Sequence, residues 1–190
     1  MFIVYAIAIG LIAGFALGGR LDGLATLRFR WPWLALAGLA LQTVLFSGAV
    51  DDAIGGVGPA LYVSSTALVL VAVLRNLSIP GLPLVALGAT SNLAAIVANG
   101  GYMPADPAAH ALAGFEEHTG FSNSVVTDSP ALRPLTDIFA IPAGIPLANV
   151  FSIGDLLIAA GIAIAIAVSM RRSAPRRSGP DVVHAGTSPD

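Results

Sequence analysis

Five long apolar segments are the feature that most constrains what this chain can form. They cover residues 1–19, 31–50, 58–74, 79–98 and 150–170. Each is close to the roughly 20 residues that an α-helix needs to cross about 30 Å of hydrocarbon. With 56% hydrophobic residues and a mean hydropathy of +0.83, the chain has more apolar surface than a soluble domain of this size buries. The pattern predicts an all-α integral membrane fold, with five transmembrane helices in a single membrane domain, residues 1–170.

The arginines predict how these helices are oriented. All nine basic residues are arginines, and Arg133 alone lies in the loops on one side. The other eight are on the opposite side: Arg20, Arg28, Arg30, Arg75, Arg171, Arg172, Arg176 and Arg177. Because arginine resists translocation, we expect the N-terminus outside, the C-terminus inside and a long extracytoplasmic loop, residues 99–149, before the last helix. The tail, residues 171–190, is rich in Pro, Ser, Gly and Arg, which predicts a disordered cytoplasmic extension.

We interpret the segment 1–19 as a retained helix. It has neither a basic region before its apolar stretch nor a small-x-small cleavage site, as a signal peptide would have. Gly10, Gly14 and Gly18 recur at every fourth residue. That spacing places three bare backbone patches on one face and predicts close contact with another helix, although glycine is also simply common in membrane helices.

Polar side chains gather in the outer halves of the predicted helices. Asn92 and Asp155 lie at a similar depth below the outer boundary, while inner halves such as 34–41 and 156–168 carry no polar side chain. Because polar groups are costly in hydrocarbon, we expect the set to line a pocket open to the outside. In the alternative, hydroxyls bond back to their own helices and the amides join neighbouring helices. The candidate pocket residues are Asn92, Asn99, Asn149, Ser152 and Gln42.

The loop 99–149 is too long for a simple connection. Residues 107–118 have the pattern of a short helix, and His110, Glu116, Glu117 and His118 in it are not at a metal-binding spacing. No metal and no cofactor is therefore expected. The stretch 135–148 is apolar but cut by three prolines, so we expect it to dip into the outer leaflet and to carry Asp137 toward Asp155.

Three stretches of sequence resemble an uncharacterised family of small polytopic bacterial membrane proteins. They are Asn-Gly-Gly-Tyr-Met-Pro at 99–104, Asp-Ile-Phe-Ala-Ile-Pro at 137–142 and Ile-Pro-Leu-Ala-Asn-Val-Phe-Ser-Ile-Gly-Asp at 145–155. The resemblance implies a multi-pass protein of the bacterial cytoplasmic (inner) membrane. It implies no activity, because the family has none assigned.

A second resemblance is to lipoprotein signal peptidase, a membrane-embedded aspartyl peptidase. Gly88 to Leu93 is similar to a Gly-Asn-Leu motif of that family, and the stretches around Asp137 and Asp155 are similar to its two catalytic aspartate motifs. Ser152 stands where the family has Asn. The resemblance implies that Asp137 and Asp155 are catalytic.

Asp155 also has a local interpretation. Ser152-Ile-Gly-Asp155 is a capping-box pattern, in which the acid satisfies free N–H groups at a helix start. Such a cap requires no second acid in an apolar loop, so Asp137 is the residue that distinguishes the two interpretations.

Two classes of function remain, and whether the protein is an enzyme stays open. The first is a membrane protein of unknown activity whose outer pocket binds a lipid or peptide ligand or assists envelope assembly. The second is an aspartyl peptidase-like hydrolase. The apolar inner halves argue against a transporter unless the chain oligomerises. A nucleotide-binding role lacks a Gly-rich phosphate loop, and the absence of cysteine excludes thiolate chemistry. The partners expected are the lipid bilayer and an outer-leaflet ligand, with no nucleic acid; the sequence does not give the oligomeric state.

Overall fold

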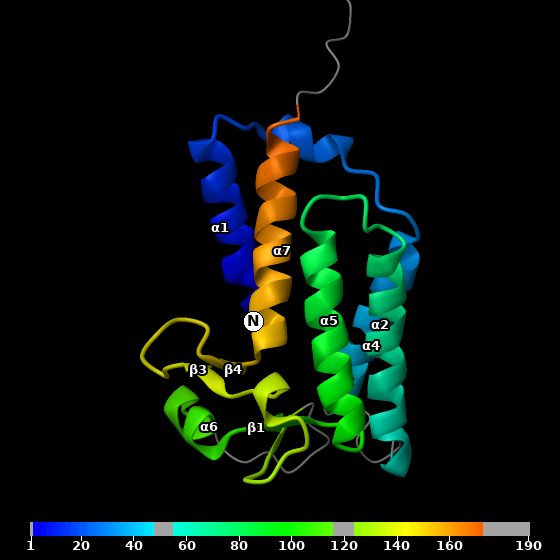
Figure 1. Ribbon diagram of the computed structural model, residues 1–190, viewed down its shortest axis with the longest axis vertical. Helices are drawn as coiled ribbons and strands as arrows, with labels where there is room; N and C mark the ends of the chain where they lie inside the picture. The colour runs from blue at the N-terminus through cyan, green and yellow to red at the C-terminus, as the bar shows by residue number, and fades with distance from the viewer. Residues whose placement is uncertain (1, 48–54, 116–123, 173–190) are drawn as a thin grey trace, which may run out of the picture.

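The computed structural model describes residues 2–47, 55–115 and 124–172, and the fold is mostly helical (Figure 1). The expected disorder of the tail lies almost wholly outside the described residues. Five long helices occupy the five apolar segments. They are α1 (Phe2–Ala16), α2 (Pro32–Leu45), α4 (Gly58–Leu74), α5 (Leu82–Ala98) and α7 (Ile153–Met170). Short 3-10 turns precede α2 and α4: η1 (Leu21–Thr26) and η2 (Gly55–Val57).

The helices are shorter than the predicted spans, except for α4. Of the described helices, α7 with 18 residues is long and apolar enough to cross a membrane, whereas the other four apolar helices have between 10 and 17 residues. At 1.5 Å per residue, 17 residues reach only about 25 Å. Five membrane crossings therefore remain a prediction.

Proline and glycine determine where several helices begin. A proline lies in the first turn of α2, α4 and α5, where its missing N–H has no helical partner to lose. Before α5, Gly81 has φ of 91°, a left-handed conformation that glycine adopts without strain. The predicted start at residue 79 is thus shifted to Leu82.

The five helices pack in the order α1, α7, α5, α4, α2, and successive helices along the chain run in opposite directions (Figure 1). The close contact predicted for α1 is present for two of its three glycines. A Cβ on Gly10 would lie 3.0 Å from the Ala163 Cα, and one on Gly14 would lie 2.3 Å from the Met170 Sδ. Gly18 lies after the helix, with φ of 76° and open space around it.

α5 and α7 approach even more closely, backbone against backbone. A Cβ on Gly81 would lie 2.1 Å from the Gly161 carbonyl oxygen, and one on Gly88 would lie 2.3 Å from the Gly154 carbonyl oxygen. Only glycine fits at these positions. The approach brings the end of α5 next to the start of α7.

The segment between α5 and α7, which we call the cap, covers this end of the bundle (Figure 1). We call this end of the bundle the cap end. Its elements are β1 (Met103–Ala105), α6 (Pro107–Ala113), β2 (Ser124–Val126), η3 (Arg133–Leu135), β3 (Phe139–Ile141) and β4 (Asn149–Phe151). β1 pairs with β2 in parallel, and β3 pairs with β4 antiparallel. The helix predicted over 107–118 ends at Ala113, because Gly114 takes a left-handed conformation; residues 116–118 lie outside the described residues.

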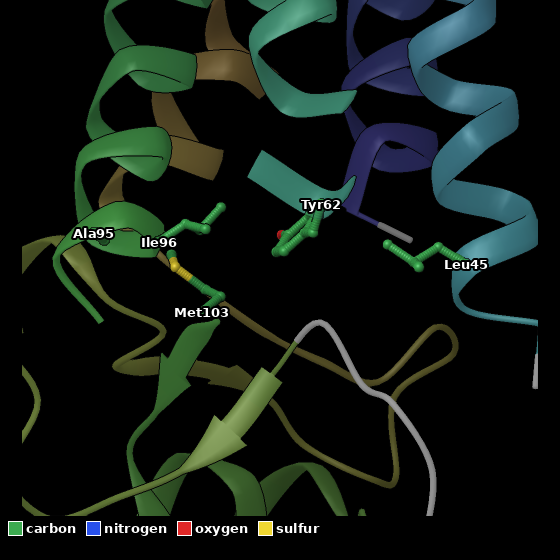
Figure 2. Close-up of a cluster of buried hydrophobic side chains, with 5 residues drawn as sticks. All are labelled: Leu45, Tyr62, Ala95, Ile96 and Met103. Atoms are coloured by element: carbon green, nitrogen blue, oxygen red, sulfur yellow. The ribbon is translucent and has the colours of Figure 1, made fainter. Parts of the chain in front are cut away.

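A buried apolar cluster fixes the cap to the helices. Figure 2 shows its members, which come from α2, α4, α5 and β1: Leu45, Tyr62, Ala95, Ile96 and Met103. Met103 is 4% exposed, so the first strand of the cap is anchored in the core. The cap is therefore a part of the fold and not a loose loop.

Candidate functional site

A closed set of hydrogen bonds joins α5 to the first turn of α7. The Asn92 Nδ2 donates to Asp155 Oδ1 at 2.8 Å, and the Ser152 hydroxyl lies 2.8 Å from Asn92 Oδ1. We call Asn92, Ser152 and Asp155 the polar network. It is possible at this distance because Gly154 has no side chain: a Cβ there would lie 1.9 Å from Asn92 Oδ1.

The capping box expected from the sequence is present in this network. The Asp155 N–H donates to the Ser152 hydroxyl oxygen at 3.0 Å, and the Ser152 N–H donates to Asp155 Oδ2 at 3.0 Å. A hydroxyl has one proton, so Ser152, which also lies 3.1 Å from Asp155 Oδ2, donates to either Asn92 or Asp155 at one time. Both carboxylate oxygens of Asp155 thus accept a hydrogen bond within the network.

Asp137 is held in the cap by backbone pairing with β1. Its N–H donates to the Pro104 carbonyl at 2.9 Å, and its own carbonyl accepts from the Asp106 N–H at 2.9 Å. This pairing is an isolated parallel bridge between Asp137 and Ala105, which is itself 1% exposed. The preceding turn η3 contacts both α5 and α7. The cap therefore carries Asp137 to the end of the helix pair that holds the polar network.

The environment of the Asp137 carboxyl favours its neutral form. The side chain is buried at 7% exposure, and its Oδ1 has no hydrogen-bond partner among the described residues. Burial, and secondly the nearby charge of Asp155, raise the pKa of Asp137 from 3.8 to about 8. At neutral pH, Asp137 is accordingly protonated.

The other predicted pocket residues lie elsewhere. Gln42 on α2 donates to the Thr66 hydroxyl on α4 at 3.2 Å, so α4 and α5 separate it from α7. Asn99 holds the loop at Ala131, through bonds of 2.8 and 2.9 Å to its backbone N–H and carbonyl. Asn149 lies in β4 opposite Ile141. Of the predicted set, the structure brings together Asn92, Ser152 and Asp155, with Asp137 near them.

Four of the helical hydroxyls bond back to their own helices, as the alternative interpretation expected, whereas the buried Ser91 and Ser169 hydroxyls have no hydrogen-bond partner among the described residues. The hydroxyls of Ser64, Ser65, Thr66 and Thr90 donate to carbonyls three or four residues earlier. A shallow hollow is lined by Pro59, Ser64 and Gly101, and no residue of the polar network lines it. The four bonded hydroxyls therefore need no ligand.

Two polar arrangements were missed from the sequence. Asp106 caps α6 by accepting from the Ala108 N–H at 2.9 Å, and its carboxylate pairs with Arg133 at 3.0 Å. The Arg133 guanidinium is the first cause that lowers the pKa of Asp106. Asn76, which is 2% exposed, binds the backbone of Arg30. Asp106 directly before Pro107 is a helix-start signal that could have been used, whereas the partner of Asn76 lies 46 residues away.

Within the described residues, no three His, Asp or Glu side chains are grouped so that they could hold a metal ion. The chemistry available at the cap end is that of two carboxyl groups, an amide and a hydroxyl. This set can exchange protons and form hydrogen bonds with an organic ligand.

The bonds within the polar network predict coupled mutational effects. Asn92→Ala and Asp155→Ala should each lower the free energy of unfolding by about 1–3 kcal/mol, because each leaves a partner unsatisfied. The double variant should lose less than the sum, because the second change removes a partner that has already lost its bond. Thermal unfolding in detergent measures all three, and Gln42→Ala combined with Asp155→Ala is the matched pair that should be additive. Additivity for Asn92 and Asp155 would mean that their bond contributes nothing.

Comparisons with known proteins give a family but no activity. The sequence model of DUF5317, a family of unknown function, matches residues 26–167. The predicted resemblance to an uncharacterised family is confirmed to that extent. No curated protein matches the chain, and no solved structure matches it. Neither the similarity to lipoprotein signal peptidase nor the bacterial origin has support from these comparisons.

Proposed function

The chain belongs to the DUF5317 family of unknown function, and we propose that it is a multi-pass membrane protein that binds a lipid or peptide group at its outer face. Asp137 makes the contact, and the polar network next to it fixes the geometry. The single observation that carries the proposal is the buried, neutral Asp137 carboxyl, whose Oδ1 is without a partner among the described residues.

Exposed apolar side chains support the membrane setting. On α1 and α2, Ile12 is 69% exposed and Leu36 is 65% exposed. They belong to a long series of exposed large hydrophobic residues that continues on α4, α5 and α7. Soluble proteins rarely leave such large apolar areas in water, whereas hydrocarbon solvates them without cost. A bilayer adapts by local thinning to helices a few residues short of its thickness.

The arginines support an orientation with the cap end outside. Arg20 lies between α1 and η1, and Arg75 and Arg171 directly follow α4 and α7, at the end of the bundle opposite the cap. Arg28 and Arg30 precede α2 at that same end. We call it the arginine end. Positive residues stay in the cytoplasm, so the cap faces outward and the arginine end faces inward.

Single-cysteine labelling tests this topology, because the chain has no cysteine of its own. Ser129→Cys, in the exposed part of the cap, should react on intact cells with a membrane-impermeant thiol reagent. Ser78→Cys, in the exposed turn between α4 and α5, should react only after the membrane is opened. The opposite pattern would put Asp137 on the cytoplasmic side and contradict an outer binding site.

The β3–β4 hairpin supports a ligand that arrives from the membrane. Residues 138–154 contain no charged side chain. Ile145 at its tip is 48% exposed, and the Tyr5 hydroxyl of α1 donates to the Pro146 carbonyl. The apolar tip is thus continuous with the exposed face of α1, which is the position of an element in the outer leaflet.

The carboxyl chemistry sets what kind of group fits. A protonated Asp137 both donates and accepts a hydrogen bond, while Asp155 beside it carries the negative charge of the network. An anionic group would be repelled by that charge. The site suits a neutral or cationic polar group, such as a hydroxyl, amide or amine, on an apolar molecule.

A hydrophobic carbodiimide tests whether the site is open to such a molecule. Dicyclohexylcarbodiimide partitions into membranes and reacts with protonated carboxyls, so Asp137 in the wild-type protein should form a covalent adduct. The reaction should slow as the pH rises through about 8, because the carboxyl then ionises. Peptide mass spectrometry after labelling in vesicles gives the modified residue.

Asp137→Asn is the control, and it should prevent the adduct while Asp155 stays unmodified in both proteins. Absence of an adduct at Asp137 below pH of about 8 would mean that the carboxyl is closed to ligands of this size. That result would contradict the binding function.

The second candidate function is an aspartyl hydrolase, and the neutral Asp137 near Asp155 favours it. A protonated and an ionised carboxyl can act as general acid and general base on a water molecule. The Asp155 oxygens are, however, both engaged in the polar network, so they would have to exchange a bond to activate water. Turnover of a quenched-fluorescent lipopeptide that is lost in Asp137→Asn and Asp155→Asn would favour the hydrolase over the binding protein.

A further inference from the structure

A cluster of arginine and tryptophan side chains lies at the arginine end, where α4 ends and α2 begins. The Arg75 guanidinium lies over the Trp31 ring, with 4.6 Å from its Cζ to the ring centroid. Trp33 lies next to Trp31, with 6.5 Å between the ring centroids. A guanidinium over an indole face is attracted by the ring's electrons and is held in one orientation.

The Asn76 side chain connects the two helices at this cluster through hydrogen bonds to the backbone. Its Oδ1 accepts from the Arg30 N–H at 2.6 Å, and its Nδ2 donates to the carbonyls of Arg30 at 2.8 Å and Ala72 at 2.7 Å. The amide therefore binds both backbone groups of Arg30. Because Asn76 follows Arg75 directly, one short segment both binds the backbone of Arg30 and carries the guanidinium that lies over Trp31.

The backbone of Trp31 is held in an unfavourable conformation. Its φ is 56°, the left-handed region, which for a bulky residue costs of the order of 1 kcal/mol or more. Trp31 is nevertheless 44% exposed. The fold thus keeps the Trp31 indole at the surface, beneath the Arg75 guanidinium, although the backbone of Trp31 is in an unfavourable conformation.

Both arginines of the cluster carry unneutralised charge. Arg30 and Arg75 are exposed, and neither has an ion pair with any described residue. The described acid at this end is Asp22, and its carboxylate contacts Arg20 at 3.3 Å. The arginine end is strongly positive, and the ring contacts and hydrogen bonds above fix the position of this cluster within it.

We propose that Arg30, Trp31 and Arg75 bind the phosphate of an anionic phospholipid in the cytoplasmic leaflet. The proposal rests on the membrane setting and orientation proposed above. The Arg75 guanidinium, which is held over the Trp31 ring, can bond to phosphate oxygens, the exposed Arg30 adds a second positive charge, and indole rings lie at the headgroup level of a bilayer. Leu36 at 65% exposure and Leu74 at 46% exposure lie on the two helices that carry the cluster, where the acyl chains of the same lipid would lie. The apolar neighbours favour a lipid over a free phosphate ion.

Tryptophan fluorescence in vesicles tests the proposal directly, because Trp31 and Trp33 are the two tryptophans of the chain. In a Trp33→Phe background, Trp31 alone reports which lipid is bound. Brominated lipids quench it on contact, so titrating brominated phosphatidylglycerol against plain phosphatidylcholine, and the reverse, gives a relative affinity. We expect phosphatidylglycerol to be preferred by about fivefold, as one fixed arginine provides.

Arg75→Gln should reduce that preference nearly to one, because Arg75 is the arginine held over the Trp31 ring, and Arg30→Gln should reduce it by a smaller factor. The matched control is Arg172→Gln, which removes an exposed charge from the same end but outside the cluster, and should keep most of the preference. Equal loss in Arg172→Gln and Arg75→Gln would overturn the proposal, because the preference would then come from the general positive field. Relief of quenching by inorganic phosphate would also overturn it, in favour of a soluble anion.

Failure of this proposal can be told from failure of the membrane setting. If neither brominated lipid quenches Trp31, the arginine end is not at a bilayer and both proposals fail. If both lipids quench Trp31 equally in the Trp33→Phe protein with all its arginines in place, the membrane setting holds and the anionic lipid site alone is wrong.

Discussion

Replacing Gly161 by leucine should separate α5 from α7 and largely unfold the protein. A Cβ at this position would lie 2.5 Å from the Gly81 carbonyl oxygen and 2.9 Å from the Val85 backbone nitrogen. Backbone atoms inside a helix contact cannot move aside as a flexible side chain can. We expect the free energy of unfolding to fall by about 3 kcal/mol or more, at the upper end of what overpacking costs.

Gly144→Leu is the matched control. Nothing lies within 4 Å of a Cβ on Gly144, and this residue is not among those with positive φ. The stability of Gly144→Leu, measured by thermal unfolding in detergent, should therefore be close to that of the wild type. Equal stability of the two variants would mean that α5 and α7 do not pack backbone against backbone.

Hydropathy alone predicted where the helices are, because a long apolar run in hydrocarbon satisfies all its backbone hydrogen bonds within itself only as a helix. The capping box at Ser152 and Asp155 was equally predictable, since its partners are three residues apart. Such features depend on the local sequence. They could therefore be predicted without knowing which helices pack against each other.

Neighbours across helices were not predictable in the same way. Gln42 and Asn92 were placed in one pocket because both lie in the outer halves of their predicted helices, but depth does not give the helix pairing. Gln42 meets Thr66 on α4, whereas Asn92 meets Asp155 on α7. The packing order of the helices separates two residues that hydropathy places together.

The burial of Asp137 depends on contacts far along the chain. It is buried by pairing with β1, more than 30 positions before it, and β1 is itself anchored through Met103. The sequence predicted that an apolar, proline-cut stretch would carry Asp137 inward. It contained no signal for the strand that holds Asp137, because three residues with a central proline do not have a strand pattern.

The pH dependence of stability should reveal that the Asp137 carboxyl is protonated in the folded protein. In the unfolded chain this carboxyl ionises near 3.8, and in the folded protein its pKa is about 8. Between these values the folded state binds one more proton than the unfolded state. Asp137 therefore lowers the free energy of unfolding by up to about 1.4 kcal/mol for each pH unit as the pH rises. Its full stability is present below 3.8 and is lost by about 8, above which the contribution no longer changes.

Asp137→Asn should remove this slope, since an amide is neutral throughout and has nearly the same size. At neutral pH the variant should be several kcal/mol more stable than the wild type, whereas near the unfolded pKa of 3.8 the two should be similar. Unfolding in detergent, repeated across this range, measures the difference, and Asp128→Asn, an exposed acid of the same loop, is the control. A functional site that keeps a buried acid at the expense of stability predicts this result. Parallel stability curves for Asp137→Asn and the wild type would mean that Asp137 is ionised in the folded protein, and both the binding and the hydrolytic roles would lose their neutral carboxyl.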